Sequence, residues 1–67
     1  MHNLEIQMKV KLDLQGLDGN AFVLLGAFRK AAQRQGFPET EIDAILNEAK
    51  SGNYNHLLSV LIAHTEK

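Results

Sequence analysis

The sequence predicts an α+β fold: one N-terminal β-strand over about residues 4–14, then three α-helices over about residues 20–35, 38–51 and 53–65. Two patterns support this prediction, namely strict apolar–polar alternation in the first segment and apolar residues at helical spacing in the other three. A third observation concerns assembly. Because only one segment has the pattern of a strand, we expect that strand to pair between subunits of a homo-oligomer.

The strand prediction rests on residues 4–14, in which apolar and polar side chains alternate without interruption. This alternation is typical of a strand with one buried and one solvated face. No Gly, Pro or Asn-Gly pair interrupts the segment, so we expect no hairpin within it. The apolar face consists of Leu4, Ile6, Met8, Val10, Leu12 and Leu14.

A turn over residues 15–20 precedes the first helix, and Asp18 or Asn20 is suited to cap it. Gly36 has the position of a C′ residue and closes the helix. Phe22 and Val23 lie off the core stripe, so the first half is apolar nearly all round and we expect a second chain to cover it. The core stripe is Ala21, Leu24, Leu25, Phe28 and Ala31 or Ala32.

The second helix starts after Pro38, with Phe37 and Ile42 placed to form a hydrophobic staple around its first turn. Ser51-Gly52 ends it, and Asn53 caps the third helix. Both helices show apolar stripes at helical spacing. The stripes are Ile42, Ile45, Leu46 and Ala49 in the second helix, and Tyr54, Leu57, Leu58, Leu61 and Ile62 in the third.

Charge pairing restricts how the strand would pair with its own copy. In an antiparallel pair the sum of facing residue numbers is constant, and sums of 16 or 14 place Glu5 opposite Lys11 or Lys9. The strand could instead join a partner protein's sheet. The expected subunit interface comprises Leu4, Ile6, Met8, Val10, Leu12, Phe22 and Val23.

Composition narrows the class of protein. The chain has 67 residues, 45% of them hydrophobic, which fits one domain (residues 1–67) with a marginal core. The absence of cysteine excludes disulfides and thiolate metal sites. A net charge of −1 argues against binding to nucleic acid. No apolar run approaches the roughly 18–20 residues that span a membrane, and no signal peptide is evident, so we expect a cytoplasmic protein.

The sequence offers no catalytic or metal motif. His56 and His64 are about 12 Å apart along one helix, too far to share a metal ion. Ser51 and Ser59 lack the context of an activated nucleophile. We therefore expect a protein that is not an enzyme and that holds no metal or cofactor.

One basic cluster is suited to bind an anion. Arg29, Lys30 and Arg34 lie on the C-terminal half of the first helix, and the planar guanidinium group of arginine binds phosphate in a bidentate manner. Equally, cations near a helix C-terminus favour the helix dipole and solvate the surface. The candidate ligand-binding residues are Arg29, Lys30, Arg34, Tyr54, Lys9 and Lys11.

Three segments resemble a group of short uncharacterised proteins from phages and bacteria. They are Asp18 to Phe22, Arg34 to Phe37 and Ser51 to Leu58, and the resemblance extends over residues 8–63. The group has Asp-Gly-Asn-Ala-Phe, a Gln-Gly-Trp-like corner and Gly-Asp-Tyr-Asp-His-Leu-Leu at these places. This sequence departs from that pattern at Phe37, Asn53 and Asn55. The resemblance implies a phage or mobile-element setting and no particular activity.

Residues 20–65 are also similar to ubiquitin-associated three-helix domains, through the Gly36-Phe37 corner and the helix spacing. The strand is not part of that pattern.

The leading functional hypothesis is a non-enzymatic, homo-oligomeric binding protein. Its most specific form is a counter-defence factor that sequesters a small anionic, nucleotide-like ligand at subunit clefts. The alternative is a protein–protein inhibitor or adaptor that docks a host protein through an apolar helix face, with Phe22, Val23 and the third helix in contact.

Overall fold

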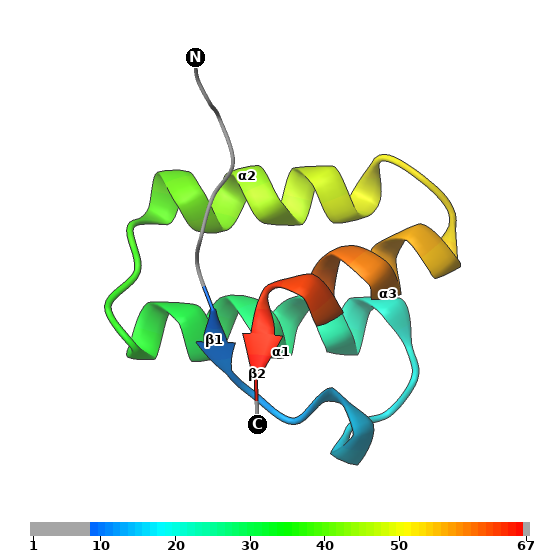
Figure 1. Cartoon of the computed structure of the whole chain (residues 1–67), viewed down its shortest axis with the longest axis horizontal. Coiled ribbons are helices and arrows are strands. Elements are labelled where there is room, and N and C mark those ends of the chain that lie inside the picture. Colours follow the sequence, from blue (N-terminus) through cyan, green and yellow to red (C-terminus); the bar gives the residue numbers. More distant parts are fainter. Residues whose placement is uncertain (1–8, 67) are drawn as a thin grey trace.

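The computed structural model describes residues 9–66, in which a short strand pair accompanies three helices (Figure 1). The expected α+β class is therefore confirmed. β1 and β2 form a two-stranded parallel sheet, with Val10 beside Thr65 and Lys11 beside Glu66. Each helix contacts the other two, and α1 and α3 also contact the strands. The elements are β1 (Val10–Lys11), the 3-10 helix η1 (Leu14–Gly16), α1 (Ala21–Arg34), α2 (Glu39–Lys50), α3 (Tyr54–Ala63) and β2 (Thr65–Glu66).

Side chains and one glycine fix the limits of α1, as the sequence predicts. The Asn20 side chain accepts a hydrogen bond from the Phe22 N–H at 2.8 Å. At the other end Gly36 adopts a φ of 89°, and the Phe37 N–H donates to the Ala32 carbonyl at 3.1 Å. This is the Schellman arrangement, which requires a left-handed residue at C′.

The later helices also begin where expected. Pro38 is the N-cap of α2, and Phe37 is half-buried against the core. Asn53 caps α3, since its side chain accepts from the His56 N–H at 2.9 Å. The prediction was wrong at the end of α3, because Thr65 lies in the strand β2 rather than in the helix.

The predicted strand is shortened in the part that the structure describes. Of residues 9–14, only Val10 and Lys11 are in β1, and Leu14 belongs to η1. The reason is local: the Asp13 carboxylate accepts a hydrogen bond from the Gln15 N–H at 3.0 Å and caps η1. Side-chain bonds of this kind compete with strand pairing. Residues 4–8, with Leu4, Ile6 and Met8, lie outside the described residues.

The expectation that no strand partner exists within the chain was wrong. The Val10 and Leu12 N–H groups donate to the carbonyls of His64 and Glu66, each at 2.8 Å. Val10 is fully buried in its own core, so it offers no surface to another subunit. Self-pairing in the predicted registers would have to displace bonds that β1 makes within the chain. Pairing between subunits stays a prediction.

One core joins all three helices and β1. The apolar stripe of α2 is buried as predicted, whereas the stripes of α1 and α3 are buried only in part. Four of their residues are half-buried at the margin of the core: Ala21, Leu25, Ala31 and Leu58. The buried residues are Val10, Leu24, Phe28, Ala32, Ile42, Ile45, Leu46, Ala49, Leu57 and Leu61.

Candidate functional site

Large apolar side chains are exposed near the start of α1 and along α3. Phe22 is 84% exposed and Ile62 is 60% exposed, while Val23 and Tyr54 are each nearly half exposed. Isolated exposed apolar residues are ordinary, but a contiguous apolar surface marks an interaction site. Whether these side chains form an interaction site therefore depends on how Tyr54 and Ile62 are arranged around the neighbouring pockets.

The geometry of α3 creates the apolar surface. Leu57 and Leu61 face the core. Tyr54, Leu58 and Ile62 follow one another at intervals of four residues, so they form a neighbouring row along the helix. The helix rises about 12 Å from Tyr54 to Ile62. Because the described residues leave this row partly uncovered, α3 presents an apolar ridge beside its buried face.

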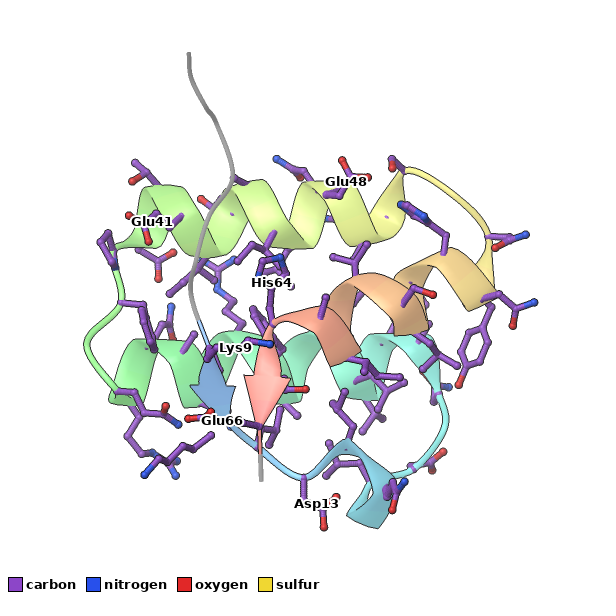
Figure 2. All side chains as sticks on the ribbon, in the orientation of Figure 1. Lys9, Asp13, Glu41, Glu48, His64 and Glu66 are labelled. Atoms are coloured by element: carbon purple, nitrogen blue, oxygen red, sulfur yellow. The ribbon has the colours of Figure 1, made fainter. Side chains whose placement is uncertain are left out.

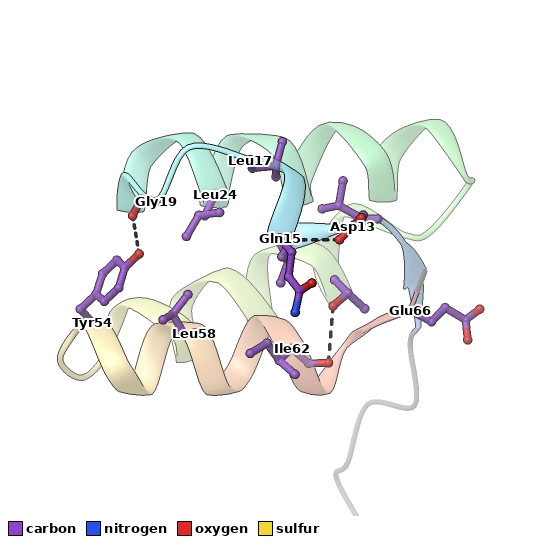
Figure 3. Close-up of a pocket in the computed structure, with 12 residues that line it drawn as sticks. Asp13, Gln15, Leu17, Gly19, Leu24, Tyr54, Leu58, Ile62 and Glu66 are labelled. Atoms are coloured by element: carbon purple, nitrogen blue, oxygen red, sulfur yellow. Dashed lines mark hydrogen bonds between the residues drawn. The ribbon is translucent and has the colours of Figure 1, made fainter.

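A large pocket lies between this ridge and the segment from β1 to α1 (Figure 3). Its volume is about 510 Å³. In Figure 3, Leu58 and Ile62 line the α3 side, and Leu17 and Leu24 lie across from them. The lining is mostly apolar, and Asp13 and Glu66 lie at the end of the pocket away from Tyr54 (Figure 3). The apolar residues are Leu12, Leu14, Leu17, Leu24, Leu58 and Ile62, and the polar ones include Asp13, Gln15, Thr65 and Glu66.

The smaller pocket, of about 330 Å³, adjoins the larger one at Tyr54. Phe22, Leu25 and Leu57 contribute apolar lining, and Lys50 is its one cationic residue. Tyr54 lines both pockets, and we call the two together the α3 groove. The groove thus carries carboxylates at one end and an ammonium group at the other.

Two segments noted for their resemblance to phage and bacterial proteins meet at Tyr54. Its hydroxyl donates a hydrogen bond to the Gly19 carbonyl, although the two residues are 35 positions apart in sequence (Figure 3). Asn20 and Asn53 cap the helices that begin beside this contact. Gly19 and Tyr54 both line the larger pocket, so this contact forms part of its wall.

The basic cluster is partly neutralised. Arg29 lies 3.0 Å from a carboxylate oxygen of Glu39 and 3.4 Å from one of Asp43, so two α2 carboxylates share its charge. Lys30 and Arg34 are exposed on α1. None of these three cations lines either pocket of the α3 groove. The predicted ligand-binding set is not gathered around either of these cavities.

The other predicted ligand residues have structural contacts of their own. The Lys9 ammonium donates to the Ala63 carbonyl at 2.8 Å, which ties β1 to the end of α3 (Figure 2). Main-chain groups of Lys11 bind the Gln35 side chain. Tyr54, also a candidate ligand-binding residue, lines both pockets of the α3 groove, and neither pocket is lined by Arg29, Lys30 or Arg34.

Ser51, His56 and Glu48 come together between α2 and α3, which the sequence did not indicate. His56 Nε2 is 3.0 Å from a Glu48 carboxylate oxygen and 3.4 Å from Ser51 Oγ. A relay of the Ser-His-acid type needs the acid on one ring nitrogen and the serine on the other. Here His56 Nε2 is near both the Glu48 carboxylate and Ser51 Oγ, so this arrangement connects α2 to α3 and does not activate the serine as a nucleophile.

Within residues 9–66, no group of histidine and acidic side chains is placed to hold a metal ion. No described helix combines the length and the apolar character needed to cross a membrane.

The chain matches no protein family, and it shows no significant similarity to a curated protein or to a solved structure. The phage-protein and ubiquitin-associated resemblances therefore stay predictions, and the candidate function depends on the geometry of the α3 groove.

The sequence pattern singled out some residues of this groove, such as Tyr54, Leu58 and Ile62, but did not place them in a common site. Tyr54 and Ile62 were assigned to the core stripe of the third helix, yet they are exposed. An apolar stripe of i, i+3, i+4 and i+7 positions is wide, and only the contacts of the fold decide which edge of it is covered. Leu12, Leu14 and Leu17, at the start of the chain, give no local sign that they face α3.

Proposed function

We propose that the protein is a non-enzymatic interaction protein that docks an apolar helix of a partner protein in the α3 groove. The observation behind this proposal is the partly exposed row of Tyr54, Leu58 and Ile62 beside the larger pocket. In helix-in-groove recognition, an amphipathic helix lays its apolar face into a hydrophobic groove. Pockets of several hundred Å³ with mainly apolar linings are typical binding sites.

The alternative, sequestration of a nucleotide-like anion by Arg29, Lys30 and Arg34, has less support from the geometry. Two carboxylates already contact Arg29. A phosphate group would have to displace them or bind to cations on an open surface, where interactions are weak. We therefore favour the apolar groove as the site.

Self-association through residues 4–8 is a separate proposal about assembly. Those residues continue the alternating pattern toward the N-terminus, beyond the part of β1 that pairs within the chain. Single cysteines placed at Ile6, Gln7 or Met8 test it, because the chain contains no other cysteine. A cross-link between symmetry-related positions supports pairing, and its absence at all three contradicts it.

Intrinsic fluorescence tests the docking proposal directly. Tyr54 is the only tyrosine and the chain has no tryptophan, so tyrosine emission reports on the groove alone. A helical peptide of leucine, alanine and glutamine, without aromatic residues or net charge, serves as the probe. We expect saturable change in the emission of Tyr54 as this peptide is added.

A pair of variants shows whether the groove is responsible. Ile62→Gln removes an exposed apolar side chain from the larger pocket, while Val23→Gln removes one that lines neither pocket. We expect the dissociation constant to rise about tenfold or more for Ile62→Gln, equivalent to about 1.4 kcal/mol. Equal affinities for both variants would contradict docking in the groove.

A further inference from the structure

We infer that a second copy of this chain occupies the α3 groove, forming a two-fold dimer in which Phe22 of each copy enters the larger pocket of the other. This inference rests on the proposed use of the groove as a docking site, and it names the occupant. A two-fold interface needs the same patch on both copies to be complementary to itself. The groove has that property in shape and in charge.

Shape complementarity comes from Phe22 and the larger pocket. Phe22 is the most exposed of the large apolar side chains described, at 84%. It stands at the margin of the smaller pocket, at the start of α1. The larger pocket is an apolar hollow of about 510 Å³ on the same molecule. One patch therefore holds both a protruding aromatic side chain and a cavity suited to receive one.

Tyr54 gives the position of the symmetry axis. It lines both pockets, so the smaller pocket, which Phe22 lines, and the larger pocket meet at this residue. A two-fold axis passing close to Tyr54 exchanges these two pockets. Phe22 of one copy then reaches the larger pocket of the other copy, and the reverse contact forms at the same time.

The same operation brings opposite charges together. Lys50 lies at the smaller-pocket end of the groove, and Asp13 and Glu66 lie at the other end. The Glu66 side chain extends outward from the end of the groove rather than into its apolar part (Figure 3). In that position it is suited to meet a cation on a neighbouring molecule. Such rim pairs contribute orientation more than affinity.

Sedimentation equilibrium of the full chain tests the dimer. We expect a reversible monomer–dimer equilibrium in the wild type. Phe22→Gln should raise the dissociation constant by about thirtyfold or more, as for a buried aromatic anchor. Val23→Gln, also exposed but outside both pockets, should leave it nearly unchanged. A wild-type monomer throughout the micromolar range, or equal effects of the two variants, would overturn the inference.

Charge reversal tests the two-fold orientation. Lys50→Glu and Glu66→Lys should each weaken the dimer, because each places like charges at the rim. The double variant should recover the wild-type dissociation constant, because opposite charges again face each other between copies. A double variant that dimerises no better than the single variants would contradict this arrangement. Circular dichroism of each variant verifies that its helices are intact.

One competition experiment separates this inference from the proposed function. The uncharged helical peptide is added to the chain while both self-association and Tyr54 emission are followed. Dissociation of the dimer as the peptide binds supports both proposals. Peptide binding to a chain that never dimerises overturns the dimer and leaves partner docking intact. A dimer that the peptide cannot enter supports the dimer and contradicts docking of a partner helix in the groove.

Discussion

The Gln35 carboxamide pairs with both main-chain groups of Lys11. Its Oε1 accepts a hydrogen bond from the Lys11 N–H at 2.9 Å, and its Nε2 donates to the Lys11 carbonyl at 3.0 Å. The side chain thus takes the place of a neighbouring strand on the edge of β1 that faces away from β2. Because Gln35 is also the C-cap of α1, this pair fastens the helix end to the sheet. Protected edges of this kind oppose pairing with another chain.

Removing the Gln35 side chain should destabilise the position of β1 against the end of α1. We expect Gln35→Ala to lower the free energy of unfolding by about 1 kcal/mol, since two exposed main-chain groups lose a partner. Gln33→Ala is the control, because the Gln33 side chain bonds the exposed Glu39 carboxylate and no main-chain group of β1, and its loss should cost less than about 0.5 kcal/mol. Urea denaturation gives both values. Unchanged hydrogen exchange at the Lys11 amide in Gln35→Ala would contradict the assigned role.

Gly36 should be sensitive to substitution for a purely conformational reason. An added Cβ would meet nothing within 4 Å, but the φ of 89° is costly for an L-residue. We expect Gly36→Ala to destabilise the fold by about 1–2 kcal/mol. Gly26 has equally open space within α1, so Gly26→Ala should stabilise it by about 0.5–1 kcal/mol. Thermal unfolding of the two variants should shift in opposite directions, and shifts of the same sign would contradict this account.

Gly52 should be sensitive for a steric reason. A Cβ at this position would lie 2.9 Å from ring and Cβ atoms of His56. We expect Gly52→Ala to lower the free energy of unfolding by about 1–3 kcal/mol. The same substitution in a His56→Ala background should cost less, because the ring atoms are gone and only the contact with the Cβ at position 56 remains. Additive costs across this double-mutant cycle would show that the His56 ring does not obstruct a side chain at position 52.

The Arg29 ion pairs predict a small effect on stability and none on ligand binding. Arg29 and its partners Glu39 and Asp43 are about half exposed, and exposed pairs contribute about 0–1 kcal/mol each. We expect Arg29→Ala to lower the unfolding free energy by less than about 1 kcal/mol at low salt. We also expect calorimetric titration with cyclic and linear nucleotides to give no binding heat. Binding that disappears in Arg29→Ala would instead support the anion-sequestration hypothesis.

Local patterns predicted most of the fold. Asn20, Gly36, Pro38 and Asn53 mark helix limits through their own backbone and side-chain chemistry, so the helix limits agree within about two residues, as is usual for such boundaries. The burial of the α2 stripe followed from its spacing alone.

The errors arose where distant segments meet. Thr65-Glu66 has no strand pattern of its own and becomes β2 because β1 lies beside it. The alternation in residues 9–14 predicted the inward direction of Val10, but it did not predict the turn that Asp13 initiates. The α3 groove depends on which part of each apolar stripe the rest of the chain covers. That information lies in tertiary contacts and not in any single segment.

Amide chemical-shift mapping of the Phe22→Gln variant with the uncharged helical peptide is the most direct test of the α3 groove as an interaction site. The variant keeps the larger pocket but lacks the side chain that would fill it in a dimer. We expect the largest shifts in residues 12–17 and 54–62. No shifts at saturating peptide, or shifts concentrated around Arg29 and Arg34, would contradict the account.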